Sequence, residues 1–579
     1  MKNEIIELQE DVTTSPLYSE DLAPVPKSKR TWSVWSLAAL WVGMAVCIPT
    51  YMLASNIILN GINWLAALII IGLANVIITI PMVLSGHAGV KYGIPFPVLG
   101  RSSFGHNGVH IPAIIRGLIA AVWFGIQTWI GGISIYSIWC ALSGNEPVTS
   151  GYTFGQFVGF GVFWLLNVYF IWKGTESIKW LEMFAAPILV VIGIALIVWG
   201  SNEAGSFSKV LDQGQQLEVP GATLARQGDN YILTLKPIKN KEGKVKADQF
   251  QVTYPTAENN TKASDWIAIN NEITGFNLNN LANINLPAIG AENAKVEVQV
   301  RSNSNGMSIE SKKIEVPLTK GATGGLSIWP YLVMLTAMVG FWATMSISIA
   351  DITRYSKTQK EQVLGQFIGL PGTMVLYSFV GIFVTCAAVV IFDDVLLRDD
   401  APWDPAALLS KFNSPKVVII SQLFLMIATL STNIAANVIA PANAFANAFP
   451  KKIGFTGGGI ITAVLGIIIC PWWIINHIVP FLLFVSSLLG PVVAILICDY
   501  FVIRKTNLNL AGLFQTDSEY RFSSGFNPAA MIAFAIGVVV AGIGRFVPAL
   551  SWLYDLSWFS GFLVSFIVYY LLMKKGKSS

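Results

Sequence analysis

The sequence predicts an all-α polytopic membrane protein with twelve spanning helices and one inserted β-rich domain. Of its 579 residues, 54% are hydrophobic and only 12% are charged, which is typical of chains that cross a bilayer many times. Apolar stretches of about 20 residues, long enough to span the hydrocarbon core, recur through residues 34–200 and 326–573. Between them, residues 201–325 are more polar and alternate with a period of two, which is typical of strands.

Windows of this length place the spans in two sets, five before the polar insert and seven after it. We expect spans at residues 34–58, 64–86, 112–140, 154–171, 183–200, 327–350, 364–391, 417–440, 456–474, 480–500, 527–547 and 556–573. The chain then divides into an N-terminal tail (1–33), a first half (34–200), the β-rich insert (201–325), a second half (326–500), a loop (501–526) and a last helix pair with its tail (527–579).

Basic residues predict the side of the membrane on which each loop lies. An even number of spans puts both tails on one side, and the loops of that side hold most of the Lys and Arg, among them Lys91, Lys173, Arg354, Lys452 and Arg504. Because basic loops stay in the cytoplasm, we expect cytoplasmic termini, a cell (inner) membrane location and an extracytoplasmic insert.

Charge and motifs argue against several other classes of protein. The formal charge is +4 and the basic residues are scattered, so no nucleic-acid partner is predicted. All five cysteines lie in apolar stretches without CxxC or Cys/His spacing, which indicates neither disulfides nor a zinc site. HExxH and GxSxG motifs are absent from the sequence, so the chain is not expected to be an enzyme.

The insert is predicted to be a β-sandwich-like domain outside the membrane. Alternation is clear at Tyr231, Leu233 and Leu235, and an Asn305-Gly306 pair further on is typical of a hairpin turn. The size of the insert favours an immunoglobulin- or fibronectin-like arrangement. Two interpretations stay open: an insertion without a function of its own, or a domain that binds an extracytoplasmic partner or gates the membrane part.

Two spans are interrupted at corresponding positions of the two halves. The first span contains Gly43 and Pro49, and the sixth span contains Gly340. Paired interruptions indicate an inverted-repeat carrier, because unwound backbone exposes carbonyl groups and helix ends at the middle of the membrane. The alternative is that glycine and proline are simply frequent in membrane helices.

Polar and aromatic side chains deep in the spans predict a binding site for a small planar heterocycle. Trp123 and Gln127 lie four residues apart on the third span, and Asn433 and Asn437 have the same spacing on the eighth. An indole can stack on a flat ring, and a carboxamide can pair with ring N–H and C=O groups. Trp342, beside the interruption of the sixth span, offers a second aromatic wall, although tryptophans also anchor helices at membrane surfaces.

The eighth span also predicts a sodium site beside this pocket. Ala428, Ser431 and Thr432 lie on one helical face, so a carbonyl and two hydroxyls can coordinate a small hard cation. Carbonyl groups of the first span near Gly43 and Val46 can complete the coordination shell. The alternatives are hydroxyls that bond back to their own helix and coupling to protons, although the deep parts of the spans hold no titratable group.

Five segments of the chain resemble the nucleobase:cation symporter family 1. They are LSGHAGVKYGIPFPVLGRSSFG after the second span, RGLIAAVWFGIQTWIGG in the third, DITRYSKTQKEQVLGQFIGLPG after the sixth, IATLSTNIAANVIAP in the eighth and LGPVVAILICDYFVIRK in the tenth. The resemblance implies a LeuT-type five-plus-five inverted repeat with two extra C-terminal helices, which moves nucleobases, hydantoins or allantoin by alternating access. The family pattern does not explain the insert.

Carried onto this chain, the resemblance implies the same set of residues. The implied roles are a ring sandwich by Trp123 and Trp342, hydrogen bonds from Gln127 and Asn437, and sodium coordination by Ala428, Ser431, Thr432 and the carbonyls of Gly43 and Val46. Gly340 and Asn433 are expected at the same pocket. Cys47 stands in the first span where the hydantoin carrier has Gln and an allantoin-type member has Asn, and a thiol is a weaker donor. We expect a monomeric sodium symporter, with a proton-coupled permease and a non-transporting membrane sensor as alternatives.

Overall fold

The computed structural model describes most of the chain, with gaps at a number of loops. The described residues are 5–59, 62–145, 147–148, 152–173, 175–214, 222–235, 247–258, 260–269, 274–289, 295–304, 307–310, 314–319, 328–391, 409–410, 414–474 and 477–575. Within these ranges, seven helices are long and apolar enough to cross a membrane, or up to nine if each of two bent pairs is one span. Three shorter apolar helices fall on the fifth, sixth and ninth predicted spans. Every predicted span therefore coincides with an apolar helix, while twelve actual crossings stay a prediction.

The helices of the first half follow the predicted spans closely. They are α1 (Val34–Ala45), α2 (Ile48–Leu59), α3 (Trp64–Tyr92), α4 (Phe96–Phe104), α5 (His110–Ser143), α6 (Phe154–Lys173), α7 (Thr175–Ala204) and α8 (Phe207–Gly214). The Asn63 side chain caps α3 by accepting from the backbone of Ala66, and Gly93 ends the helix at φ 73°. The first span is broken as predicted, because α1 and α2 meet at a bend of 67° at Val46 and Cys47.

The second half is more fragmented than the first. Its helices are α10 (Trp329–Phe341), α11 (Ala343–Ser348), α12 (Ala350–Thr353), α13 (Gln359–Ile391), α15 (Pro415–Asn437), α16 (Ile439–Ala448), α17 (Phe455–Ile468), α18 (Pro471–Ile474), α19 (Ile478–Ile497), α20 (Pro528–Ile543), α21 (Ser551–Asp555) and α22 (Ser557–Lys575). The sixth span is interrupted, but at Trp342 and Ile349 and not at Gly340 as predicted.

Gly340 has a packing role in the structure. A β-carbon built on it would lie 2.2 Å from Ser486 Oγ and 3.0 Å from Leu482 O, both on α19. Glycine therefore lets α10 and α19 approach closely, and the helix continues through this position to Phe341.

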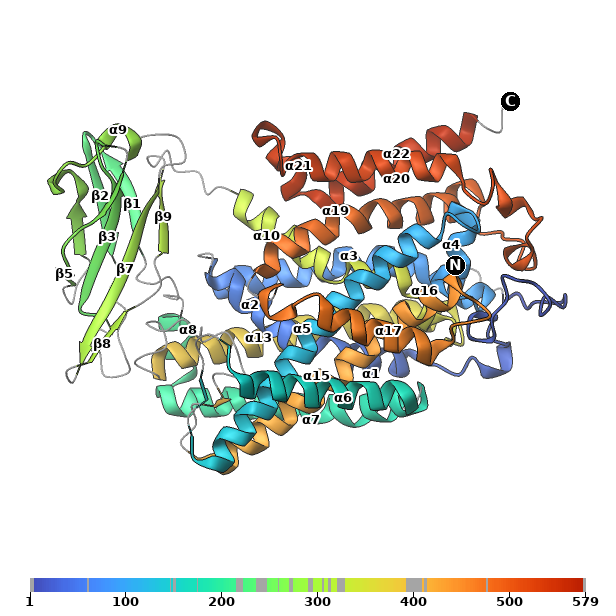
Figure 1. Cartoon of the computed structure of the whole chain (residues 1–579), viewed down its shortest axis with the longest axis horizontal. Coiled ribbons are helices and arrows are strands. Elements are labelled where there is room, and N and C mark those ends of the chain that lie inside the picture. Colours follow the sequence, from blue (N-terminus) through green and yellow to red (C-terminus); the bar gives the residue numbers. More distant parts are fainter. Residues whose placement is uncertain are drawn as a thin grey trace.

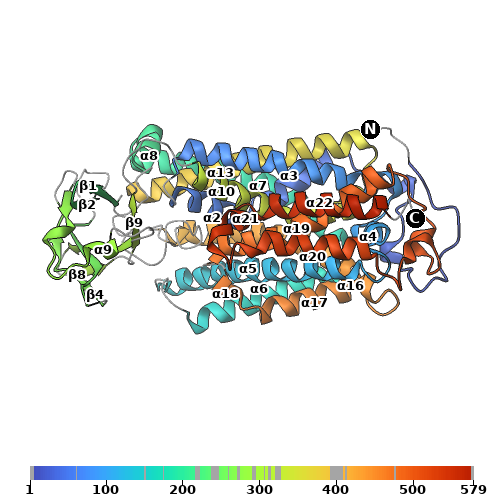
Figure 2. The same cartoon turned by 90° about the horizontal axis from the view of Figure 1, so that it is seen from above.

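The long helices lie side by side and share one apolar core. Figures 1 and 2 show them running along the long axis of the molecule, with the β strands at one end. The core contains residues of both halves, including Trp41 of α1, Phe124 of α5 and Val485 of α19. Among the helix pairs, α5 and α15 are in extensive contact along their lengths. The helices of the third and eighth predicted spans are therefore neighbours in the bundle.

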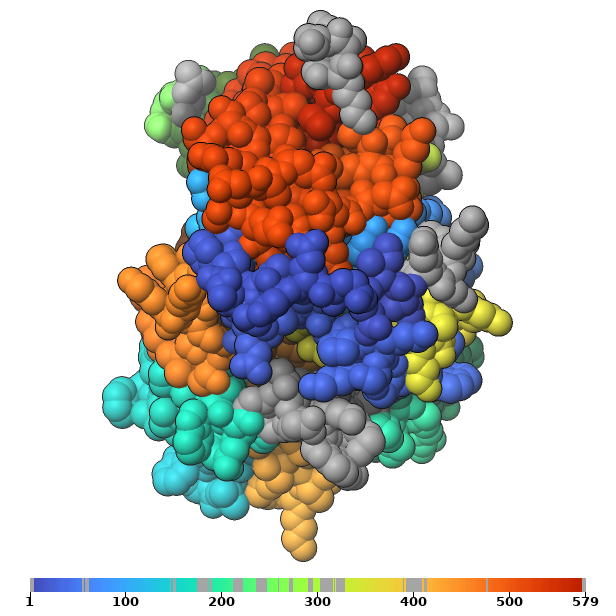
Figure 3. All heavy atoms as spheres, turned by 90° about the vertical axis from the view of Figure 1, so that its right-hand side faces the viewer, coloured from blue at the N-terminus to red at the C-terminus, as the bar shows by residue number. Residues whose placement is uncertain are grey.

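The N-terminal segment, residues 5–33, packs across the end of the bundle opposite the β strands (Figure 3). The carboxylate of Asp21 accepts from the backbone N–H of Phe455 at the start of α17, at 2.9 Å. Arg354, just after α12, donates to the backbone carbonyl of Asp21 at 3.1 Å, and Val25 N–H donates to Gly93 O beyond α3. The segment thus joins the ends of three helices that are distant in the sequence.

The described residues of the insert form a nine-stranded sheet, with seven of the strands in one hydrogen-bonded path. They are β1 (Thr223–Gln227), β2 (Asn230–Leu235), β3 (Gln249–Pro255), β4 (Thr261–Ala263), β5 (Ile267–Ala268), β6 (Thr274–Asn277), β7 (Lys295–Ser304), β8 (Met307–Glu310) and β9 (Ile314–Thr319). The order is β4-β3-β7-β9-β1-β2-β6, with β5 beside β3 and β8 beside β7. Only the β1–β9 pair is parallel among the pairings of the described strands.

The sheet folds back on itself around a core of its own. The rings of Phe250 on β3 and Phe276 on β6 are 5.8 Å apart, although their strands lie near opposite ends of the path. Leu233 and Val298 belong to the same buried cluster, so the two ends of the sheet face each other as in a sandwich. The predicted turn at residues 305–306 lies outside the described residues, and the flanking strands pair as expected.

Candidate functional site

The break in the first span frees two backbone carbonyls that a continuous helix would use. Cys47 N–H donates to Ala45 O, where an unbroken helix would direct it to Gly43 O. Thr50 N–H likewise donates to Cys47 O and leaves Val46 O without its usual helical donor. The break thus presents two acceptors in the interior of the bundle.

These carbonyls lie against α15. Thr432 Oγ1 donates to Gly43 O at 3.0 Å, and Val46 packs with Ala428 in a small buried cluster. Ser431 Oγ is buried without a hydrogen-bond partner. The structure therefore brings all five residues of the predicted sodium site to one junction. Carbonyl and hydroxyl oxygens, one of them unpaired, are the ligands that a small hard cation takes, so the residues present fit such an ion.

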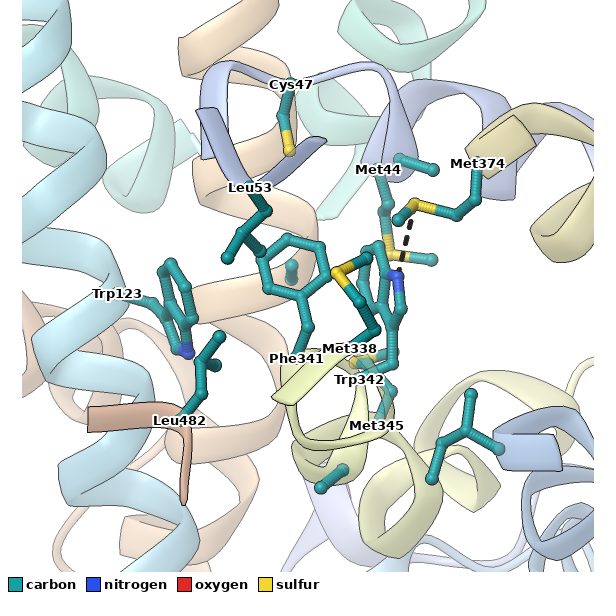
Figure 4. Packing of buried hydrophobic residues seen from close by; sticks show 14 of the residues in the cluster. Met44, Cys47, Leu53, Trp123, Met338, Phe341, Trp342, Met345, Met374 and Leu482 are labelled. Carbon is teal, nitrogen blue, oxygen red and sulfur yellow. Dashed lines mark hydrogen bonds between the residues drawn. The ribbon is translucent and has the colours of Figure 1, made fainter. Parts of the chain in front are cut away.

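Three aromatic rings line up near the break of the sixth span (Figure 4). Phe341 makes edge contacts with both predicted tryptophans, at ring distances of 5.3 Å to Trp123 and 5.0 Å to Trp342. Trp342 donates its indole N–H to Met374 Sδ at 3.3 Å and meets Trp41 edge-on. The two tryptophans were predicted to face each other across a ligand, and Phe341 stands between them here. Sequence reasoning missed Phe341, although it directly precedes Trp342.

The carboxamides form a buried chain between α5, α6 and α15. Asn433 Nδ2 lies 3.1 Å from Asn167 Oδ1, 3.2 Å from Thr128 Oγ1 and 3.3 Å from Phe124 O. Asn433 Oδ1 accepts from Asn437 Nδ2 at 3.0 Å. Asn167, on α6, is fully buried and was not singled out from the sequence, since a lone Asn in a span has no periodic partner.

Asn437 lies level with Trp123. Asn433 of α15 contacts Phe124 of α5, and a β-carbon on Gly117 of α5 would lie 3.7 Å from Pro441 of α16. The residue numbers rise along α15–α16 while those of the contacted residues fall along α5, so the helices run antiparallel. The turn of α5 that carries Trp123 is therefore opposite Asn437. Asn437 remains buried at 5% exposure.

Gln127 and Cys47 complete the predicted set. Gln127 follows Trp123 by one turn of α5, and its Oε1 is buried with no hydrogen-bond partner. Cys47 Sγ lies 3.3 Å from Thr50 Oγ1 and belongs to the same buried cluster as Trp123, Phe341 and Trp342. The thiol therefore has a partner on its own helix.

Arg116 is a buried cation in the third span that the sequence reasoning did not consider. Its guanidinium donates to Thr344 O at 3.1 Å, to Ser348 Oγ at 3.2 Å and to Ala436 O at 3.2 Å. The side chain thereby joins α5 to α11 and to the end of α15, next to Asn437. Arg116 lies in the first turns of α5, and a basic residue near the end of a predicted span does not stand out in the sequence as a buried group.

Apolar spans that are broken beside a buried hydroxyl of α15 in one half and beside a buried indole in the other are typical of multi-pass membrane carriers. The family described as "Permease for cytosine/purines, uracil, thiamine, allantoin" matches residues 24–226 and 277–561, and the chain belongs to it. The prediction of the nucleobase:cation symporter family is thus confirmed, and so is the expectation that the chain is not an enzyme. The match omits residues 227–276, inside the β insert.

Individual relatives agree with this assignment. The allantoin permease of Bacillus subtilis is 31% identical over 96% of this chain and 93% of its own length. The purine-uracil permease NCS1 of Arabidopsis thaliana is also 31% identical, over 96% of this chain and 78% of its own. Among solved structures, Mhp1 in a closed conformation with bromovinylhydantoin bound is 21% identical and covers 96% of both chains with a TM-score of 0.66. That likeness confirms the LeuT-type fold of the bundle.

Proposed function

We propose that this permease is a secondary active symporter that imports a neutral planar heterocycle of the nucleobase, allantoin or hydantoin class together with sodium. The names of the two 31%-identical relatives and the ligand of the solved Mhp1 structure support the substrate class. The single observation that supports the coupling is the junction of the broken first span with α15. The freed carbonyl of Gly43 accepts a hydrogen bond from Thr432 there, on the helix that carries Asn437.

In this proposal, sodium would be held by the carbonyls of Gly43, Val46 and Ala428 and the hydroxyls of Ser431 and Thr432. A bound cation supplies a positive charge that attracts the oxygens of both helices. The ring would lie beside Trp123 and Trp342, and the amides of Gln127 and Asn437 would face its polar edge. Asn433 would support Asn437 through the hydrogen bond between the two amides. Cys47 and Gly340 would lie on the surrounding helices. Phe341 must turn aside for a ring to lie between the tryptophans, because its side chain contacts both.

Alternating access would use the interruptions of the helices as hinges. The bend at Val46 and Cys47 and the breaks at Trp342 and Ile349 interrupt helical hydrogen bonding, so α1–α2 and α10–α12 can tilt against α5 and α15. We place the N-terminal segment and the end of α22 in the cytoplasm of the cell and the β unit outside. The support is their position at opposite ends of the bundle (Figure 1) and the basic loops of the N-terminal side.

Uptake into proteoliposomes tests the proposal. With an inward sodium gradient and the membrane potential held constant, the wild-type protein should accumulate at least one of radiolabelled uracil, allantoin and hydantoin. Asn437→Ala should lose this uptake, because the ring loses its amide partner. Asn75→Ala on α3 should keep it, since the Asn75 amide donates to Ile71 O of its own helix. Uptake driven equally by a proton gradient without sodium, or absent for every compound, would contradict the proposal.

A further inference from the structure

The amide nitrogen of Asn433 has no hydrogen left for a ligand. A primary amide has two hydrogens, and three acceptors surround this one: Asn167 Oδ1, Thr128 Oγ1 and Phe124 O. The Phe124 carbonyl can only accept, and the Thr128 hydroxyl already donates to that carbonyl at 2.7 Å. The nitrogen of Asn433 must therefore face α5, and its oxygen must face Asn437.

Asn167 is held in the matching orientation. Its Nδ2 donates to Phe163 O of its own helix at 2.9 Å, so the carbonyl end of the Asn167 amide is directed to Asn433. Asn167 and Asn433 are both fully buried, so their contact is closed to water. Because three acceptors share the two hydrogens of Asn433, an amide hydrogen is left unpaired only when two of the acceptors are removed. The contact anchors α15 to α6 at this level.

The orientation of Asn433 decides which atoms Asn437 offers to a ligand. Asn433 Oδ1 can only accept, so Asn437 must turn its Nδ2 toward it, as observed at 3.0 Å. Asn437 Oδ1 is then directed away from Asn433, together with one remaining amide hydrogen. Across the interface, Gln127 Oε1 is buried and unpaired. Leaving a buried acceptor without a donor is unfavourable, so a ligand that brings N–H groups is favoured.

We infer that Asn433, anchored by Asn167, is a positioning residue that fixes Asn437 as an acceptor, so that the pocket selects rings with free N–H groups. The inference rests on the proposed function and specifies its substrate class: lactam and ureide rings, in which an N–H stands beside a C=O. Such an edge matches the oxygen and the remaining hydrogen of Asn437. Rings that are alkylated at nitrogen present no donor and should be rejected.

Equilibrium binding to the purified full chain tests this, read by quenching of tryptophan fluorescence. The probes are uracil and hydantoin, each with its two mono-N-methyl forms and its N,N′-dimethyl form. For wild-type protein, the dimethyl form should bind at least about tenfold more weakly than the parent ring, since one unpaired buried acceptor corresponds to that factor. The two mono-methyl forms should differ from each other, because one of the two N–H groups faces Asn437.

Variants separate positioning from mere helix packing. A double variant that combines Asn167→Leu with Thr128→Val removes two of the three acceptors around Asn433 Nδ2. One amide hydrogen of Asn433 is then unpaired, and binding of the parent ring should weaken about three- to tenfold while dimethyl binding changes little. The ratio of the two affinities therefore shrinks. Asn75→Leu, a buried amide bonded to its own helix, should leave the ratio unchanged.

The outcomes are distinguishable from failure of the proposed function. If neither parent ring binds wild-type protein and allantoin also fails, the proposed function and this inference both fall. If a parent ring binds but its dimethyl form binds equally well, the inference alone is overturned. It is also overturned if the Asn167→Leu, Thr128→Val double variant folds, as judged by melting temperature, and weakens binding of both ligand forms by the same factor.

Discussion

At the scale of single residues, Thr432 connects α15, where the sodium site is proposed, to the broken first span. Its hydroxyl bonds a carbonyl of α1 that the bend has freed from helical bonding. The neighbouring Thr429 is equally buried, but its hydroxyl donates to Leu425 O of its own helix at 2.8 Å. Two threonines of one helix thus have different partners, which provides a matched pair for experiment.

Thr432→Ala should raise the sodium concentration for half-maximal uptake about tenfold. The loss of one oxygen ligand is worth on the order of 1–1.5 kcal/mol, and 1.4 kcal/mol is a factor of ten. Thr429→Ala should leave the sodium dependence unchanged, because only a bond within its helix is lost. Uptake measured against sodium concentration in proteoliposomes checks both, and equal curves for the two variants would contradict the sodium assignment.

Gly340→Ala should destabilise the bundle. The added methyl group meets Ser486 Oγ and Leu482 O of α19, and overpacking of this kind typically costs about 1–3 kcal/mol. Gly372→Ala on α13 is the control, because nothing lies within 4 Å of its added carbon. Melting temperatures of the purified proteins check this: the first should fall and the second should hold or rise slightly. A Gly340→Ala protein as stable as wild type would contradict the close packing.

A functional residue could be predicted from the sequence where its spacing to a second polar or aromatic residue places both on one helical face. Trp123 with Gln127 and Asn433 with Asn437 were recognisable because pairs four apart share a helical face. Asn167 and Phe341 were not, since their importance comes from neighbours on other helices: Asn433 in one case and two tryptophans in the other. Gly340 was recognisable as special, but its packing against α19 could not be told from a helix break without the partner helix.

At the scale of elements, the α4–α5 connection depends on interactions that only the folded chain provides. His106 is buried there, and its Nε2 lies 3.4 Å from Ser518 Oγ in the loop before α20. Burial, with a smaller contribution from the charge of Arg101, lowers the pKa of His106 to about 4 from its ordinary value of 6.5.

The shift of the His106 pKa predicts a loss of stability in acid. Above about pH 6.5 the imidazole is neutral in folded and unfolded chains, and it makes no contribution. As the pH falls from 6.5 toward 4, only the unfolded chain takes up the proton, so the folded state is progressively disfavoured. The drop in melting temperature between pH 7 and pH 4.5 should be smaller for His106→Gln than for wild type. Parallel melting curves against pH for the two proteins would contradict the shift.

The broken helices show how far elements can be predicted. Gly43 and Pro49 bracket the observed bend at Val46 and Cys47, because a proline leaves a helical acceptor without its donor. The interruptions of α10–α12 lie at Trp342, two residues after Gly340, and at Ile349, which has no glycine or proline near it. The packing of neighbouring helices decides where a helix is interrupted, and the sequence of one segment does not contain that information.

At the scale of the whole molecule, the described residues of the β unit and of the bundle have separate apolar cores. Among the described residues, the cluster that contains Leu224 and Val316 has no member from the helices of the bundle. Leu224 on the first strand pairs with Leu318 on the last, in parallel, so the chain enters and leaves the β unit at neighbouring positions. An insert with adjacent ends can be accommodated without rearranging its host. The alternation of the sequence predicted strands, whereas the pairing order depends on long-range contacts.

Replacing residues 223–319 by a short Gly-Ser linker should leave the bundle folded and transporting. The physical reason is that the replaced residues form their own core and that their ends are adjacent. Uptake and melting temperature of the shortened protein check the expectation. Loss of uptake in a protein that still melts cooperatively would instead assign a gating role to the β unit.

Reciprocal coupling between sodium and the heterocycle is the central claim, because both are proposed to bind at the junction of the broken first span with α15. Linkage requires each to change the affinity for the other by the same factor. The most direct measurement is the dissociation constant of the ring at several sodium concentrations, and that of sodium with and without the ring, on one purified preparation. We predict that sodium tightens ring binding several-fold and that the ring tightens sodium binding equally. Ring binding that is indifferent to sodium would contradict the claim.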